Sequence, residues 1–240
     1  MAVFRPGEFT ITDKATEIAG LKKGDRVIDI GCGEGDTVAH LAEKFGFETE
    51  GIDMNLAMIS EAKSKHPGIN VKFGDGEFLD GYSSYTFDGV YMECVLSLIN
   101  LPDEALHEAY CVLKKGGKLI ISDMYEKDPD PKQLKAIKIE AERQSKIPNK
   151  EGDCENDQQR FVDFRFKGAF FKDPLIAQLK EIGYRIVEFE DRSQDLDNYV
   201  AQAVMDGENV EDLCPNLEIE VSGKKRKIGY FFLVAEKPLK

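Results

Sequence analysis

Short apolar runs alternate with segments of helical spacing along most of this 240-residue chain. The runs typical of buried strands lie near residues 26–30, 48–52, 69–73, 87–92 and 118–123. Further along, the pattern predicts a helix at 173–182 and strands at 185–190 and 228–236. Strands that alternate with helices in this way predict an α/β fold, a doubly wound parallel sheet with helices on both faces.

Two helix boundaries are suggested by individual residues. The helix before the fifth strand carries an apolar stripe at three- and four-residue spacing. It is expected to end at Gly116 and Gly117, because glycine readily adopts the left-handed C-cap conformation. Near the N-terminus, residues 7–21 are expected to form another helix, with Thr10 or Thr12 as its N-cap.

Two stretches lie outside the strand and helix alternation. The first, about 124–172, contains a charged amphipathic helix at 131–145 and then a polar loop. The second, about 193–227, contains a helix near 195–205 and a polar linker. The chain is therefore predicted to be a single domain (residues 1–240) with two insertions.

A cluster of glycines follows the first strand. The segment VIDIGCGEG at 27–35 is a short apolar strand that leads into a Gly-x-Gly-x-Gly turn, and a helical pattern begins at Asp36. Clustered glycines let backbone approach a ligand where any Cβ would collide. The spacing differs from the Gly-x-Gly-x-x-Gly turn that seats a pyrophosphate. Because Asp29 precedes the turn and Glu34 lies within it, the site is expected to suit a cationic ligand.

The second strand ends in an acid, Asp53, which lies 20 positions after Gly33. A carboxylate at this place can accept hydrogen bonds from both hydroxyls of a ribose. The ligand is therefore expected to contain a nucleoside.

At these residues the chain resembles the class I S-adenosylmethionine (SAM) dependent methyltransferases, and the resemblance covers nearly the whole chain. Residues 29–35 resemble the first motif of that family, and 113–123 resemble its turn and fifth strand. The loop at 74–76 resembles the one whose acid meets the adenine amino group. The resemblance implies a mostly parallel seven-stranded sheet whose last strand, 228–236, is antiparallel. It also implies SAM as cofactor and S-adenosylhomocysteine (SAH) as product.

The same resemblance implies a set of cofactor-binding residues. They are Asp29, Gly31, Cys32, Gly33, Asp53, Met54, Asp75, Gly76 and Met92. Within this set Cys32 is expected to offer its backbone, and Met92 to line either the adenosine pocket or the core. The N-terminal helix is expected to pack beside this cleft.

Methyl transfer from a sulfonium is an in-line displacement at carbon, so alignment of donor and acceptor can supply roughly 7 to 11 kcal/mol without any metal. The catalytic candidates are residues at the carboxyl ends of strands, where ligands of such sheets bind: Glu93, Asp123 and Tyr125. Glu93 and Asp123 end adjacent strands, so both are expected to project toward the methyl group from one rim. Either could act as general base or orient the acceptor; alternatively, each caps a strand or accepts backbone hydrogen bonds.

One cysteine follows the same strand as Glu93. The thiol of Cys94 could bind a soft substrate, although a free cysteine is more often a small buried hydrophobe. It is one of five scattered cysteines, which favour reduced thiols and a cytoplasmic protein. No Cys/His spacing matches a zinc site, and no metal is expected.

The first insertion lies where members of the resembled family often carry a substrate lid. It is expected to be mobile without ligand, to close over the acceptor, and to be cut by proteases between Lys146 and Arg160. A neutral or cationic acceptor is expected if Glu93 and Asp123 both face the cleft. An anionic acceptor is expected only if Arg160, Arg165 or Lys167 reaches it.

The composition restricts the kinds of binding partner that the chain is expected to have. The net charge of −13 disfavours nucleic acid, whose affinity comes mainly from phosphate contacts. The one dense basic run, KKRK at 224–227, is expected to be a solvated hairpin turn rather than a binding patch. The N-terminus lacks an apolar targeting region and no stretch reaches transmembrane length, so no membrane partner is expected. For the oligomeric state, the sequence leaves two alternatives, a monomer and a homodimer.

The sequence thus predicts an enzyme that methylates a small molecule. Several alternatives stay open: a SAM-binding partner subunit without turnover, a methyltransferase with a protein acceptor, and one that acts on arsenite or selenium. An arsenite enzyme would need convergent thiols, which Cys94 and Cys154 could supply, but no motif of that group surrounds them. An NAD-dependent oxidoreductase is disfavoured by the glycine spacing.

Overall fold

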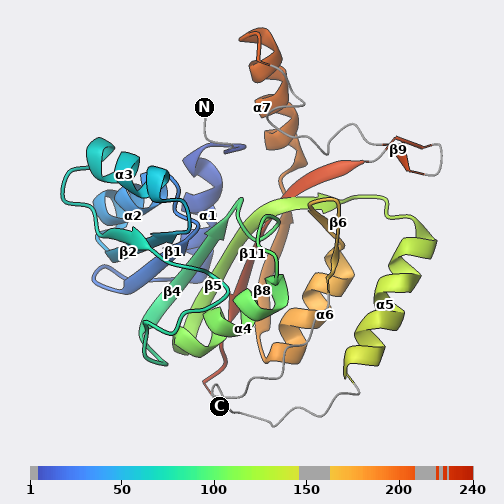
Figure 1. The fold of residues 1–240 in the computed structure, drawn as a ribbon, viewed down its shortest axis with the longest axis horizontal. Coiled ribbons are helices and arrows are strands. Elements are labelled where there is room, and N and C mark those ends of the chain that lie inside the picture. Colours follow the sequence, from blue (N-terminus) through green and yellow to red (C-terminus); the bar gives the residue numbers. More distant parts are fainter. Residues whose placement is uncertain (1–4, 146–162, 209–219, 222–223, 226, 240) are drawn as a thin grey trace.

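The computed structural model describes residues 5–145, 163–208, 220–221, 224–225 and 227–239 (Figure 1). Its centre is a sheet with the strand order β3-β2-β1-β4-β5-β11-β8. These strands are β1 (Arg26–Ile30), β2 (Glu48–Asp53), β3 (Val71–Phe73), β4 (Phe87–Glu93), β5 (Leu113–Glu126), β8 (Arg185–Asp191) and β11 (Ile228–Glu236). All neighbours pair in parallel except β11, which is antiparallel to both β5 and β8. The predicted doubly wound sheet with its antiparallel last strand is confirmed.

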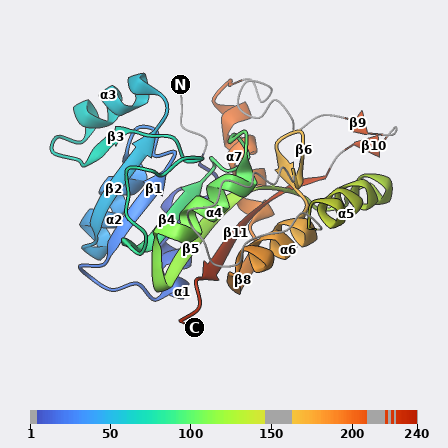
Figure 2. The ribbon, with the colours of Figure 1, turned by 60° about the horizontal axis from the view of Figure 1, so that its bottom comes forward.

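Helices cover both faces of the sheet (Figure 2). On one face lie α1 (Phe9–Ala19), α2 (Asp36–Phe45) and α3 (Leu56–Lys65), whose apolar side chains pack with those of β1 and β11 or with each other. On the other face lie α4 (Pro102–Val112) and α6 (Lys172–Ile182), which enclose the larger core. The strands β1, β4 and β5 are buried on both sides, which explains why they appear in the sequence as nearly continuous apolar runs.

The remaining elements flank this sheet. The helices α5 (Pro131–Ser145) and α7 (Ser193–Met205) lie in the two stretches predicted as insertions. The short strands β6 (Arg165–Phe166) and β7 (Ala169–Phe170) form a hairpin, and β7 pairs with the end of β5. A separate hairpin joins β9 (Glu220–Val221) and β10 (Lys224–Lys225). The first two lysines of the basic run are therefore in a strand, not in a turn.

Two predicted boundaries are wrong. The helix α4 ends at Val112, before Gly116 and Gly117, because the chain becomes extended at Leu113 and enters β5 there. The helix α1 has Glu8 at its N-cap position and no side-chain cap. Thr10 instead donates to the carbonyl of Gly7, and Thr12 donates to a distant carboxylate.

The first predicted insertion begins later than expected, because β5 continues to Glu126. Residues 146–162 lie outside the described part of the chain, and with them Arg160, Cys154 and the expected site of proteolysis. Closure of this segment over an acceptor therefore stays a prediction. No helix among the described residues has both the length and the apolar character needed to cross a membrane.

Candidate active site

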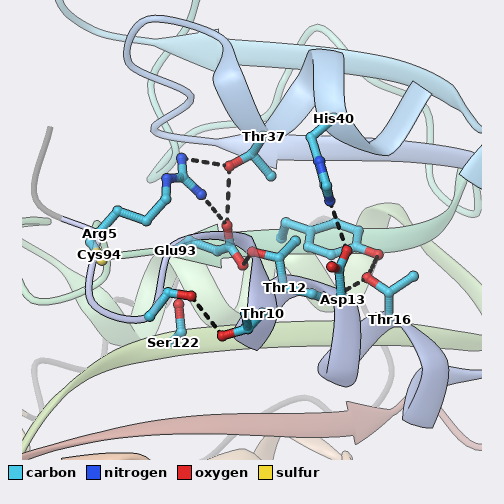
Figure 3. Close-up of polar contacts among 12 residues, drawn as sticks. Arg5, Thr10, Thr12, Asp13, Thr16, Thr37, His40, Glu93, Cys94 and Ser122 are labelled. Atoms are coloured by element: carbon cyan, nitrogen blue, oxygen red, sulfur yellow. Dashed lines mark hydrogen bonds and ion pairs between the residues drawn. The ribbon is translucent and has the colours of Figure 1, made fainter. Parts of the chain in front are cut away.

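A cavity of about 220 Å³ opens at the carboxyl ends of β1 and β4, beside the start of α1. Its lining includes Gly31 and Gly33 of the turn after β1, together with Glu93, Thr12 and Thr37. Figure 3 shows the polar contacts among these last three side chains. This is the edge of a parallel sheet where ligands of doubly wound folds bind. The N-terminal helix lines the cavity, as expected from the sequence.

The two glycines of the turn have different functions. A Cβ on Gly31 would lie 2.2 Å from Cγ2 of Val95, so this glycine is required for packing within the protein. A Cβ on Gly33 would meet no atom within 4 Å, although the backbone there has a φ of +51°. Gly33 therefore leaves room above the turn that a side chain would fill.

The acid predicted to bind ribose lies beside that open space. Oδ2 of Asp53 accepts a hydrogen bond from the backbone N–H of Gly33 at 2.9 Å, and Oδ1 accepts one from Asn55 at 2.7 Å. Each oxygen keeps a further lone pair for a ligand hydroxyl. Met54, the next residue, is exposed.

The predicted adenine-side residues lie at the end of β3. Oδ1 of Asp75 accepts from the backbone N–H of Glu77 at 2.9 Å, which holds the loop in a turn. Gly76 lies against Ile30, since a Cβ there would come within 2.5 Å of Cγ2 of that side chain. Met92 differs from this group: it is completely buried in the core that α4 covers. Of its two expected places, adenosine pocket or core, the structure shows the core.

Two further predicted residues lie in the cavity floor. Asp29 is buried, and the pKa of its carboxyl is raised well above the usual value, first by burial and then by the negative charge of Glu93. Cys32 is also buried; its Sγ lies close to Gly51, and its backbone N–H donates to the carbonyl of Ile52. Burial raises the pKa of the Cys32 thiol, so it is protonated near neutral pH.

Glu93 is the centre of a network that joins four segments of the chain (Figure 3). Its Oε1 accepts from Thr12 at 2.7 Å, and its Oε2 accepts from Thr37 at 3.0 Å and from Nη1 of Arg5 at 3.2 Å. Nη2 of Arg5 also donates to Thr37 at 2.9 Å, and the guanidinium lies 4.6 Å from the ring centre of Phe9. The carboxylate of Glu93 is thus well held and largely shielded from solvent.

Cys94 and two hydroxyl groups form a second chain of contacts in the wall. Sγ of Cys94 lies 2.8 Å from Oη of Tyr230, which donates to Oγ of Ser122 at 3.1 Å. Burial, and next the charge of Asp123, raise the pKa of the Cys94 thiol. The backbone at Cys94 has a φ of +56°, a strained conformation for a side chain other than glycine. A protonated thiol that is already hydrogen-bonded is a poor ligand for a soft metalloid.

The expectation that Glu93 and Asp123 project from one rim is wrong. The parallel register of β4 and β5 places Glu93 opposite Ser122, so Asp123 points to the other face of the sheet. There its carboxyl accepts backbone hydrogen bonds from Ser97 at 2.9 Å and from Met124 at 2.8 Å. Burial raises its pKa to about 6.

Tyr125 lies on the same face as Asp123, away from the cavity. Its ring packs edge-on against Phe189 and Phe231. Burial and the charge of Asp191 raise the pKa of Tyr125 to about 12. The structure therefore places one of the three catalytic candidates, Glu93, in the cavity.

The cations predicted to reach an acceptor are otherwise engaged where the structure describes them. Nη1 of Arg165 donates to the carbonyls of Ser97 at 2.8 Å and Ile99 at 2.6 Å, and so holds the loop after β4. The ammonium of Lys167 lies 5.7 Å from the ring centre of Phe166. The cation in the cavity is instead Arg5, which sequence reasoning missed together with Thr12 and Thr37.

One group of potential metal ligands lies on α4: Glu104, His107 and Glu108. Glu108 already accepts a hydrogen bond from the backbone N–H of Leu79 at 2.7 Å. Burial and the charge of Lys237 lower the pKa of His107. This group does not line the cavity at the glycine turn.

Residues 21–191 match a family model described as a methyltransferase domain, Methyltransf_31. The chain belongs to this methyltransferase family. The match includes the glycine turn, Asp53, and the ends of β4 and β5. It begins after α1, so Arg5 and Thr12 lie outside it.

Curated relatives are methyltransferases of several kinds. Phosphoethanolamine N-methyltransferase 3 of Arabidopsis thaliana is 31% identical over 136 residues, which cover 55% of this chain and 28% of the relative. Demethylmenaquinone methyltransferase of Renibacterium salmoninarum is 31% identical over 107 residues, which cover 45% and 44%. The aligned region thus spans less than half the length of these relatives.

Solved structures share the fold at low identity. The [4+2]-cyclase SpnF superposes with a TM-score of 0.68 at 20% identity and covers 100% of this chain and 85% of its own. Phosphoethanolamine N-methyltransferase 2 of Haemonchus contortus, solved with SAM, has a TM-score of 0.66 at 19% identity, with 98% and 54% covered. These similarities establish the Rossmann-like architecture.

The residues present fit SAM, the cofactor of this family. Gly33 leaves open space above the turn, and Asp53 lies beside it with free lone pairs. The buried carboxyl of Asp29 and the largely shielded carboxyl of Glu93 line the cavity, where a cation would be stabilised. These carboxyls do not suit a dinucleotide, because their negative charge would repel its pyrophosphate.

Proposed function

We propose that this chain transfers a methyl group from SAM to a small molecule. The observation that carries the proposal is the open space over Gly33 next to the carboxylate of Asp53, in a chain of the methyltransferase family. Asp53 would hold the ribose hydroxyls and Asp75 the adenine amino group. Asp29 and the glycine turn would hold the amino-acid end. When bound, SAM supplies an activated methyl group that needs no further electrophilic assistance.

Positioning is the main catalytic contribution of this chain in the proposal. Glu93 already accepts three side-chain hydrogen bonds, and Asp123 is directed to the opposite face of the sheet. Neither is free to take a proton from an acceptor in this arrangement. Holding the acceptor in line with the methyl group and excluding water would then account for the rate.

The acceptor is a neutral or cationic small molecule. The described lining of the cavity includes three carboxyls and one guanidinium, and that guanidinium is paired with Glu93. Arg165 is bound to backbone carbonyls. An anionic acceptor would find no uncommitted cation among these groups. The names of the curated relatives, which include phosphoethanolamine and demethylmenaquinone, also indicate small acceptors.

The test is turnover. The purified chain is incubated with SAM labelled on its methyl group and with fractions of a metabolite extract, and SAH is measured. Fraction-dependent formation of SAH, lost in Asp53→Ala, supports the proposal. Tight SAM binding without SAH formation in any fraction would favour the second candidate, a SAM-binding protein that does not methylate. The cyclase SpnF makes that candidate worth testing, because it shares the fold and is named for a cyclisation rather than a methyl transfer.

A further inference from the structure

The cavity at the glycine turn contains more acid than its one cation can neutralise. Its charged side chains are Asp29, which is buried at 4% exposure, Glu93 and Arg5, which are partly buried, and Glu8, which is exposed. The guanidinium of Arg5 forms an ion pair with Glu93 at 3.2 Å. Among the residues that the structure describes, none forms a salt bridge with Asp29, and the charge of Glu93 is close enough to raise the pKa of its carboxyl. Two carboxyls thus share one guanidinium at a site partly shielded from solvent, where charges interact more strongly than in bulk water.

The folding of β4 does not require a carboxylate at the position of Glu93. It follows the apolar core of β4, and its carboxylate faces the same cavity as the glycine turn. Removing a carboxylate from water is unfavourable unless it is hydrogen-bonded or paired. Here Thr12, Thr37 and Arg5 donate to it, from positions 81, 56 and 88 residues away in the sequence. Such a built site points to a cation that is bound there.

The amino-acid end of SAM carries a carboxylate, an ammonium and a sulfonium, and so has a net charge of +1. After methyl transfer the sulfur is a neutral thioether, and the same end of SAH is neutral overall. One guanidinium and two carboxyls together carry the complementary charge of −1 when both acids are ionised, a state that a bound cation favours although burial raises the pKa of Asp29. The donor therefore matches the cavity, whereas the product leaves it one positive charge short.

We propose that Glu93, acting with Asp29, makes this cavity selective for the sulfonium donor over the thioether product. This inference rests on the proposed function, because it assumes that SAM occupies the cavity. Glu93 is thus a specificity-determining residue rather than a general base. A pocket that holds the donor more tightly than the product also limits product inhibition.

The test is a comparison of dissociation constants, measured by calorimetry without any acceptor. Three ligands are used: SAM, SAH, and sinefungin, whose protonated amine replaces the S-methyl group. In the wild-type protein SAM and sinefungin are expected to bind at least about tenfold more tightly than SAH. In Glu93→Gln, which keeps the size and hydrogen-bonding capacity of the side chain, this preference should fall below about threefold.

The matched control is Thr12→Val, which removes one hydrogen bond to Glu93 and leaves its charge. It should weaken all three ligands by similar factors and keep the preference. Equal binding of the three ligands by the wild-type protein would overturn the inference, as would an unchanged preference in Glu93→Gln. If the wild-type protein binds none of the ligands, the proposed function itself fails. The wild-type comparison of sinefungin with SAH gives an answer even if the variant does not fold.

Discussion

The carboxylate of Asp53 accepts a hydrogen bond from the backbone N–H of Gly33 at 2.9 Å, and so joins the end of β2 to the turn that follows β1. Its second oxygen accepts from Asn55 and fixes the start of α3. The residue expected to bind ribose therefore also shapes the floor of the cavity. Its substitution should affect both the ligand and the turn.

Replacing Asp53 with alanine should weaken the binding of SAM and SAH by about tenfold or more, because hydrogen bonds to a charged acceptor contribute about 1.5 to 3 kcal/mol. Calorimetry measures the dissociation constants. Glu48→Ala, at the exposed start of the same strand, is the matched control and should bind normally. An unchanged dissociation constant in Asp53→Ala would remove Asp53 from the site.

The two glycines of the turn should respond differently to a side chain. In Gly31→Ala the new Cβ meets Val95, so the free energy of unfolding should fall by about 2 kcal/mol or more. In Gly33→Val the protein should stay folded and lose SAH binding, because the branched side chain occupies the open space. Denaturant unfolding and calorimetry separate the two effects. A folded Gly33→Val protein that still binds SAH would mean that the ligand lies elsewhere.

The buried carboxyl of Asp123 should make stability depend on pH. Its pKa in the folded protein, about 6, exceeds the value of 3.8 for an unperturbed carboxyl, so the folded state binds the proton more tightly. The contribution of this group to stability is present below about pH 4 and is lost as the pH rises through 6, with a full size of about 3 kcal/mol.

The measurement compares urea unfolding of the wild-type protein and Asp123→Asn at pH 4, 5.5 and 7. Asparagine does not ionise here, so the stability of the variant relative to wild type should improve as the pH rises. Other titrating groups cancel in the difference. Parallel stability curves for the two proteins would show that Asp123 is not titrating in this range.

The Cys94 thiol should react slowly with alkylating reagents. It is half-buried, protonated near neutral pH and hydrogen-bonded to Tyr230, whereas alkylation requires an accessible thiolate. Iodoacetamide labelling at pH 8, followed by mass spectrometry of the peptide, should be at least about tenfold slower than in the urea-unfolded chain. Equally fast labelling in the folded protein would instead support a reactive thiol that faces solvent.

The sheet could be predicted from the sequence because its determinants are local. Strands buried on both faces require apolar runs, and β1 and β11 begin and end at the predicted residues. The glycine turn could also be predicted from the sequence, because its backbone conformations need glycine whatever surrounds them. Helix ends were harder to predict. The helix α4 stops four residues before Gly116, because β5 pairs with β4 from Leu113 onward.

The candidate site could be predicted only in part, since its other determinants are not local. The face to which Asp123 points depends on the register of β4 and β5, which shifts between Phe87 and Gly89. Arg5 and Thr12 reach Glu93 through the packing of the N-terminal segment, across more than 80 residues of sequence. No short sequence motif predicts such long-range contacts. Thr37, one residue into α2, had a weak signal in its closeness to the glycine turn.

The position of β11 has a consequence for synthesis of the protein. This strand lies between β5 and β8, yet about a hundred residues separate Glu126 from Ile228. At ribosomal speeds of about 5 to 20 residues per second, the edge of β5 stays unpaired for roughly 5 to 20 s after it emerges. A long, apolar, open strand edge is a template for aggregation. The nascent chain should therefore be a client of ribosome-associated chaperones until residue 236 has been made.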